Sequence, residues 1–261
     1  MAKVDILNYI SDSNILRSTY DTDTNELDIT DVPQNLNSVI TLGQVGGEWT
    51  SDGIASMTEP NGDITLTISS IAVRGLQYRK MTGITAPNLT RIENYGCASA
   101  SNLASVSMPN LSTTNAYAFQ GCSSLTHISL PSLTTANGYL CDSCSNLEEA
   151  HLPSYSSQTG SDMFGNCSKL KIVDLGNCSK IDANCFRNTT LFDTLILRRS
   201  SVTALGNTNN AMGPRFLNGG AGGEIYVPSS LIDSYKAATN WATLEAYGTI
   251  TWKALEGSIY E

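Results

Sequence analysis

Residues 118–131 read AFQGCSSLTHISLP, and the anchors of this segment return at a fixed interval along the chain. The second half carries apolar residues at Leu125, Ile128 and Leu130, followed by a proline. Corresponding segments begin at residues 84, 106, 128 and 150, and then at residues 173 and 195, so that the steps are 22 or 23 residues. Six copies in register over more than a hundred residues predict a repeat architecture.

Each copy carries further apolar anchors before its strand-like segment. An aromatic residue or cysteine is followed three positions later by a small residue or cysteine, and then by a larger apolar residue. One unit of about 22 residues cannot bury such a face alone, so neighbouring units must stack in register. The proline that follows several copies ends the strand pairing because it has no backbone N–H to donate. The three anchor series are Cys97, Phe119, Cys141, Phe164 and Phe186; Ala100, Cys122, Cys144, Cys167 and Thr189; and Leu103, Leu125, Leu147, Leu170 and Phe192.

The phrase at residues 118–131 resembles the BspA-like bacterial leucine-rich repeat, whose pattern is A-F-x-x-C-x-x-L-x-x-I-x-L-P. The resemblance covers roughly residues 81–200. It implies a leucine-rich-repeat solenoid, a β-rich right-handed superhelix with short strands on one face and irregular, 3-10 or short helical segments on the other. The family is known for cell-surface adhesion and binding of host proteins, so the resemblance implies binding without identifying the partner.

The two ends of a solenoid must cover its exposed apolar core. We expect an N-terminal cap over residues 1–60, a repeat array over 61–224 and a strand–helix–strand cap over 225–261. The C-terminal helix is predicted to start after Ser229 or Ser230, to run through Ala242 and to end by Gly248, before a strand at Thr249–Trp252. The glycines and asparagines of residues 206–223 indicate a long loop or an enlarged repeat. The segment at residues 225–236 resembles one that often closes such arrays.

The N-terminal region gives weaker patterns. Val4–Leu16 is predicted as a short helix, whereas Leu27–Ile29, Ser38–Leu42 and Ile64–Ile68 are predicted as strands.

Charge and hydropathy argue against two classes of partner. The net charge is -9, and the basic residues form no run longer than a pair such as Arg198 and Arg199, so nucleic acid is not an expected partner. No segment approaches the roughly 20 apolar residues of a membrane span, and the N-terminus lacks the apolar core of a secretion signal. We expect a cell-surface or extracellular location if a signal was removed, and otherwise a cytoplasmic or virion-associated one.

The seven cysteines cannot all pair within the chain because their number is odd. Cys141 and Cys144 form a C-x-x-C, a spacing that suits a zinc site or a redox pair. The repeat register offers a simpler interpretation, because both cysteines occupy core anchor positions and cysteine behaves as a small buried hydrophobe. We expect mostly free thiols.

The residues between the apolar strand positions are predicted to face away from the core and to form a candidate binding face. The register places His127 beside Glu149 and His151 beside Asp174 on consecutive strands. In solenoids the strand side is often the binding side. The candidate residues are Thr82, Thr85, Ser105, Ser107, Thr126, His127, Ser129, Glu148, Glu149, His151, Lys171, Asp174, Asp193 and Thr194.

These patterns favour a non-enzymatic binding protein that takes part in cell-surface adhesion or in recognition of a protein or glycan. No catalytic, cofactor-binding or metal-binding residues are assigned. A structural or receptor-binding component of a phage or prophage is the alternative. A third hypothesis is a metal-dependent site at His127 and His151, since imidazoles beside carboxylates can hold a divalent ion.

Overall fold

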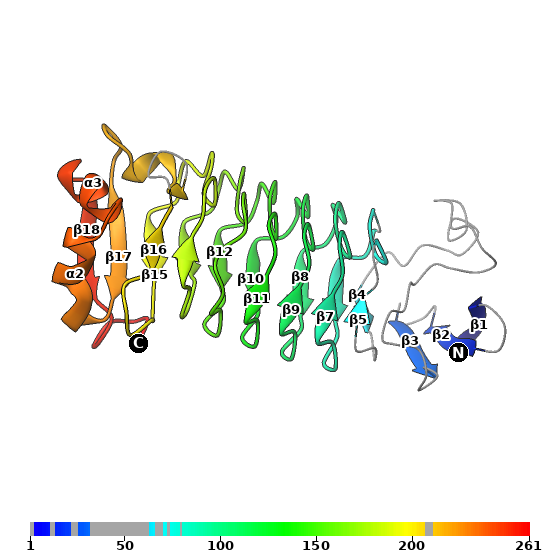
Figure 1. The fold of residues 1–261 in the computed structure, drawn as a ribbon. Coiled ribbons are helices and arrows are strands. Elements are labelled where there is room, and N and C mark those ends of the chain that lie inside the picture. Colours follow the sequence, from blue (N-terminus) through cyan, green and yellow to red (C-terminus); the bar gives the residue numbers. More distant parts are fainter. Residues whose placement is uncertain are drawn as a thin grey trace.

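The computed structural model describes residues 3–10, 14–21, 26–31, 63–65, 70–71, 74–78, 80–206 and 211–261. Figure 1 shows the successive repeats stacked side by side, with the C-terminal helices at one end of the array. The leucine-rich-repeat solenoid predicted from the sequence is confirmed.

One side of the array is built from short parallel strands. β4 (Asp63–Thr65), β6 (Gly83–Thr85) and β8 (Ser105–Ser107) form one sheet. β10 (His127–Ser129), β12 (Glu149–His151), β13 (Ile172–Asp174), β15 (Thr194–Ile196), β17 (Gly223–Val227) and β18 (Ile250–Ala254) form a second, and β10 lies next to β8. Within the repeats, Ile84 pairs with Val106 and Ile128 with Ala150, 22 residues apart. We call the outward side of β6 to β15 the strand face.

Most of the described repeats contribute a second short parallel strand. β5 (Ser70–Ile71), β7 (Arg91–Ile92), β9 (Thr113–Thr114) and β11 (Thr135–Ala136) form one such sheet, and β14 (Lys180–Ile181) pairs with β16 (Ala204–Leu205). The repeat is completed by a turn that holds two residues with positive φ, such as Tyr117 at 65° and Gly121 at 69°. In residues 80–206 these connections are irregular turns rather than helices.

The core lies between the two sheets and the turns. The three anchor series predicted from the sequence are fully buried. Phe164 stacks on Phe186 with ring centroids 5.8 Å apart, and Phe186 stacks on Phe192 at 4.1 Å. The anchors of successive repeats are therefore buried together in one core, which is what the register predicts.

The C-terminal segment differs from the prediction of one helix. A 3-10 turn, η2 (Ser229–Leu231), leads into α2 (Ile232–Ala237), and a second helix, α3, covers Trp241–Ala246. The chain breaks between them because Asn240, at φ 69°, donates its side-chain amide to the carbonyl oxygens of Leu205 and Gly206 in the last repeat. Neither serine caps the helix through its side chain. Gly248 follows α3 at φ 70°, as predicted, and β18 forms after it.

The predicted helix at Val4–Leu16 is wrong. β1 (Lys3–Ile10) and β2 (Asn14–Asp21) pair antiparallel over their whole length, and β3 (Glu26–Asp31) pairs with β2. Cross-strand hydrogen bonding satisfies the backbone, and β-branched residues such as Val4 and Ile6 suit a pleated strand.

Two other N-terminal strand predictions are confirmed as far as they can be tested. β3 contains the strand predicted at Leu27–Ile29, and β4 overlaps the one predicted at Ile64–Ile68. The strand predicted at Ser38–Leu42 lies outside the described residues. Of residues 206–223, those that the structure describes contain a 3-10 turn, η1 (Pro214–Phe216), and the start of β17.

Candidate binding surface

The first part of the strand face is a row of small polar side chains. Thr85 pairs with Ser107, and Ser129 pairs with His151, so one outward row runs from β6 to β12. Thr85, Ser107 and Ser129 are exposed, as are Ser105 and Thr126 beside them, whereas Thr82 is half-buried. The row offers hydroxyl donors and acceptors with little steric obstruction.

The middle of the strand face is charged, with Glu149 at its centre. His151 Nε2 lies 3.2 Å from Glu149 Oε2, and His127 Nε2 lies 4.0 Å from Glu149 Oε1. The predicted neighbours, His127 beside Glu149 and His151 beside Asp174, are paired as expected. The side chain of His127 is 61% exposed, and those of His151 and Glu149 are each 36% exposed. A partner can therefore contact both imidazoles and the carboxylate between them.

A second charged pair borders this centre. Lys171 Nζ donates to Glu148 Oε2 at 2.8 Å. The hydrogen bond and the charge of Lys171 lower the pKa of Glu148, and the same contacts raise the pKa of Lys171. Both groups thus stay ionised around neutral pH, and the strand face presents a fixed ion pair there.

Asp174 and Thr194 are not exposed members of the face, contrary to the sequence-based expectation. Asp174 is 3% exposed because Arg198 reaches across from the strand end of the next repeat and covers its carboxylate. Thr194 is 9% exposed and donates its hydroxyl to Asp193 Oδ1 at 2.9 Å. Asp193 itself is half-buried.

The C-terminal tail lies near the same end of the strand face. The ring of Tyr260 packs edge-on against that of Tyr226, with centroids 4.8 Å apart. Burial raises the pKa of Tyr260, and the charges of the Glu149, Glu224 and Asp193 carboxylates add to the effect. The open part of the strand face therefore ends near β12.

A comparison with known protein families agrees with this repeat geometry. The model of the BspA type leucine rich repeat region matches six copies over residues 69–207, more than half of the chain. The protein belongs to the BspA-type leucine-rich-repeat family. No curated protein matches this BspA-type chain.

Two solved structures are similar to this BspA-type chain. A leucine rich repeat protein of T. pallidum shares 16% identity, with 73% of this chain and 83% of that chain covered and a TM-score of 0.50. A leucine rich cell surface protein from Faecalibacterium prausnitzii A2-165 shares 13% identity, with 97% and 96% covered and a TM-score of 0.43. At these identities the first likeness supports the fold alone.

The cysteines of this BspA-type array are part of its core. All seven are free and buried. The thiols of Cys122, Cys144 and Cys167 donate to the carbonyl oxygens of Cys97, Phe119 and Cys141 in the preceding repeats, at 3.0 to 3.2 Å. The C-x-x-C of Cys141 and Cys144 therefore has the structural role that the register predicted.

The described part of the chain contains no group of three or more His, Cys, Asp or Glu residues arranged to hold a metal ion. None of its helices is long and apolar enough to cross a membrane.

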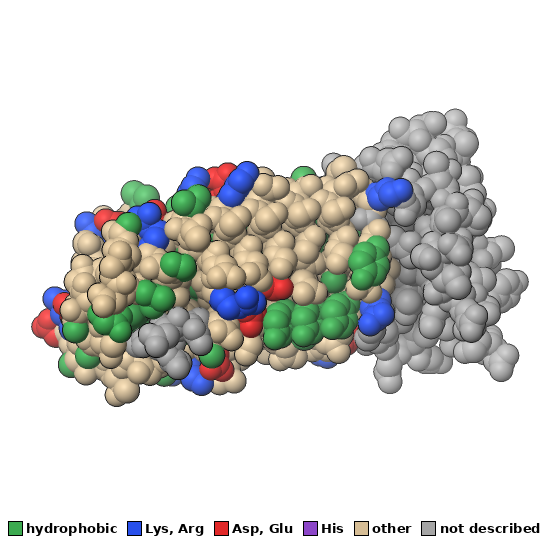
Figure 2. Space-filling model, turned by 90° about the horizontal axis from the view of Figure 1, so that it is seen from above, with side chains coloured by type: hydrophobic (Ala, Val, Ile, Leu, Met, Phe, Trp, Pro, Cys, Tyr) green, Lys and Arg blue, Asp and Glu red, His purple; other side chains and the backbone are tan. Residues whose placement is uncertain are grey.

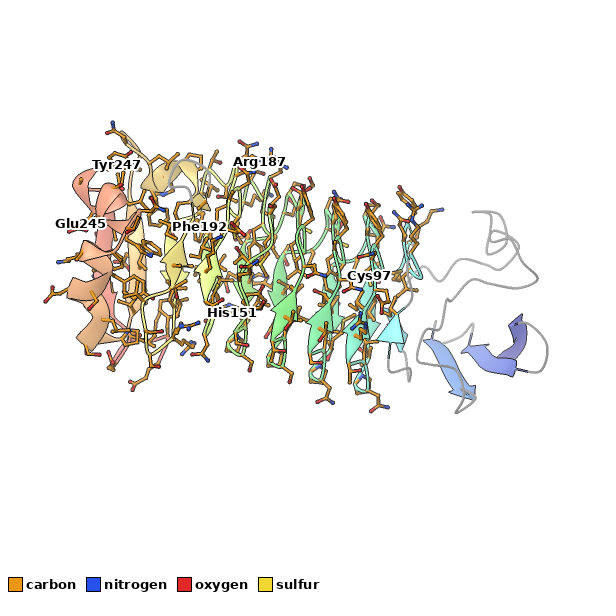
Figure 3. All side chains as sticks on the ribbon, viewed as in Figure 1. Cys97, His151, Arg187, Phe192, Glu245 and Tyr247 are labelled. Carbon is orange, nitrogen blue, oxygen red and sulfur yellow. The ribbon has the colours of Figure 1, made fainter. Side chains whose placement is uncertain are left out.

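One surface feature of the BspA-type repeats was missed from the sequence. Tyr95, Tyr117 and Tyr139 stack in successive turns of the array. The charge of Arg187 interacts with Tyr139, and Figure 3 shows Arg187 on the side of the array away from His151. The spacing of 22 residues between the three tyrosines is visible in the sequence. This period, which the apolar anchors share, is the signal that could have revealed them.

Proposed function

We propose that this BspA-type protein is a non-enzymatic binding protein that recognises a protein or glycan through the strand face from β6 to β12. The observation that carries the proposal is the outward polar row of Thr85, Ser107 and Ser129, which continues in register to His151. Small hydroxyl-bearing side chains let a partner approach closely, and the charged centre at Glu149 supplies polar contacts.

We further propose that the protein acts in adhesion at the cell surface or outside the cell. Membership of the BspA-type family supports this location, because the family is known for surface adhesion. The chain's charge of -9 disfavours phosphate backbones as the partner.

A binding screen with matched variants tests the proposal. The full chain is offered to a glycan array and to a panel of extracellular matrix proteins: fibronectin, laminin and collagen. Ser129→Arg places a large charged side chain in the polar row. It should lower the affinity for a ligand that binds this row by about tenfold or more. Thr135→Arg, at an exposed position of the opposite sheet, is the control and should leave binding unchanged.

Two results would contradict the proposal. Equal binding by wild type and Ser129→Arg would place the ligand elsewhere on the protein. A loss of binding in Thr135→Arg as large as in Ser129→Arg would show that the interaction responds to overall charge rather than to the strand face.

A further inference from the structure

Three tyrosines form an ordered row on the turn side of the array, separate from the strand face. The ring centroids of Tyr95 and Tyr117 are 4.4 Å apart and the ring planes differ by 2°. Those of Tyr117 and Tyr139 are also 4.4 Å apart, at 13°. All three side chains are half-buried and none belongs to the core. Figure 2 shows an apolar strip on this side of the molecule, and we call Tyr95, Tyr117 and Tyr139 the tyrosine row.

The backbone under the tyrosine row does not favour tyrosine. Tyr95, Tyr117 and Tyr139 have φ of 60°, 65° and 64°. In the next two turns the same place is taken by Asp162 at 51° and Asn184 at 62°. Asp and Asn tolerate this left-handed conformation, whereas bulky residues rarely adopt it. Local backbone preference therefore does not explain three successive tyrosines, although stacking offsets part of the strain.

A cation stands at each end of the row. The guanidinium carbon of Arg74 lies 5.2 Å from the ring centroid of Tyr95. At the other end, Arg187 Nε donates to Asp162 Oδ1 at 2.7 Å, and its charge interacts with Tyr139. The Arg187 side chain is 44% exposed, while that of Asp162 is 7% exposed. Figure 2 shows basic side chains at both ends of the apolar strip, on a chain whose net charge is -9.

The tyrosine row also offers hydrogen-bond donors. Each of the three side chains ends in a phenol hydroxyl, which can donate one hydrogen bond. Burial raises the pKa of Tyr117, and both neighbouring phenols add to this effect. The phenol of Tyr117 consequently stays protonated at neutral pH and can donate to an acceptor on a partner.

We propose that the tyrosine row binds a proline-rich segment of a partner protein in the polyproline II conformation, with acidic residues at one end of that segment beside Arg74. Polyproline II has no internal hydrogen bonds, so its carbonyl oxygens are free to accept from the phenols, and proline-rich segments dock on aromatic surfaces.

The spacing of the rings supports this conformation over an extended strand. One polyproline II turn of three residues advances about 9.3 Å. The outer rings, Tyr95 and Tyr139, are separated by two steps of 4.4 Å, which is close to that advance. A β-strand repeats its side-chain direction every two residues, about 6.6 Å, and does not fit this spacing. Arg74, which stands over the ring of Tyr95, selects acidic residues at that end of the segment, whereas the charge of Arg187 is already paired with Asp162.

The test uses the full chain and a fluorescent oligoproline peptide with two glutamates at one end. Wild type should bind this peptide saturably and should not bind a Gly/Ser peptide with the same glutamates. Tyr117→Asn should weaken binding about tenfold or more, since a central tyrosine is a typical hot spot. Asn184 occupies the same place at φ 62°, so this variant should fold and melt no lower than wild type.

Two further variants complete the test. Tyr78→Ala removes a tyrosine that is 69% exposed and outside the stack, and it should leave the affinity unchanged. Arg74→Gln should weaken binding and reduce its salt dependence. The proposal is overturned if wild type does not bind the oligoproline peptide, if it binds the Gly/Ser peptide equally, or if Tyr117→Asn binds like wild type. Preference for an acidic oligosaccharide such as hyaluronan would also overturn it, in favour of a glycan.

Discussion

The guanidinium of Arg198 holds the carboxylate of Asp174, 24 residues earlier in the chain. Arg198 Nη2 and Nε lie 2.8 Å and 3.0 Å from Asp174 Oδ2. The Asp174 side chain is 4% exposed and that of Arg198 is 26% exposed. The backbone N–H of Gly176 also donates to the carboxylate at 2.9 Å. This pair occupies the outward position on β13 and limits the strand face on that side.

Arg198→Ala should destabilise the array because it leaves the Asp174 carboxylate buried without its cation. Removing one partner of a buried ion pair lowers the free energy of unfolding, and we expect a loss of about 3 kcal/mol here. This value is at the low end of the usual range because Arg198 is partly exposed. The measurement is the free energy of unfolding from urea titration at neutral pH. Lys171→Ala, which breaks the exposed pair with Glu148, is the control and should have a much smaller effect. The double variant of Arg198→Ala and Asp174→Asn is the further check. If its loss in free energy of unfolding equals the sum of the two single losses, the two side chains do not interact.

The repeat fold could be predicted because every repeat carries the same anchors. Leu125, Ile128 and Leu130 share their spacing with the other copies, and stacking in register is the only way to bury them together. The pairing of His127 with Glu149 followed directly from that register. Arg198 has no counterpart in the other repeats, so periodicity could not show that it covers Asp174.

The ends of the chain could be predicted less well for a related reason. Apolar residues at Val4, Ile6 and Leu7 suit either a helix or a strand, and the pairing with β2 decides between them. At the C-terminus, the side chain of Asn240 reaches the last repeat and interrupts what its helical periodicity predicted as one helix. Both outcomes depend on contacts between separate segments, which local patterns do not contain.

Gly160→Ala should be strongly destabilising because consecutive repeats approach closely there. A Cβ atom at Gly160 would lie 2.2 Å from the backbone N and Cα of Gly138. Backbone atoms cannot move aside without disturbing the stacking, so we expect a loss of about 3 kcal/mol, the upper part of the range for overpacking. Gly248→Ala is the control: it has φ 70° and open space, and should cost about 1 kcal/mol from conformation alone. Thermal melting followed by circular dichroism compares the two. Equal losses would mean that the repeats are not packed as closely at Gly138 as the structure shows.

Phe164→Asp should unfold the array cooperatively. Phe164 is fully buried and stacks on Phe186, so the substitution places an unpaired carboxylate in the core ladder at a cost of several kcal/mol. Phe164→Leu keeps an apolar side chain and should retain the fold with a moderate loss of stability. Near-ultraviolet circular dichroism and urea titration measure both variants. An unchanged transition in Phe164→Asp would show that this residue does not lie in the ladder.

The cysteines of the core should make the stability of the array sensitive to alkaline pH. Burial raises the pKa of Cys97 and of Cys178 to about 12. It also raises the pKa values of Cys122, Cys167 and Cys185. The pKa of Cys141 is raised by its hydrogen bond with Cys144 and, second, by burial. In the folded state these thiols therefore stay protonated at pH values where exposed thiols ionise.

The sign of the pH dependence follows from this difference between the two states. Above about pH 8.5 the unfolded chain releases thiol protons that the folded chain keeps, so the free energy of unfolding falls as pH rises toward 12. Each such cysteine contributes up to about 1.4 kcal/mol per pH unit. Urea titrations between pH 7.5 and 10, with reductant present, should show that the free energy of unfolding declines steeply as pH rises. In Cys97→Ala the slope of this decline should be smaller by up to about 1.4 kcal/mol per pH unit, because one fewer thiol proton is released on unfolding. A free energy of unfolding that stays constant across this range would mean that the thiols are not buried in the folded array.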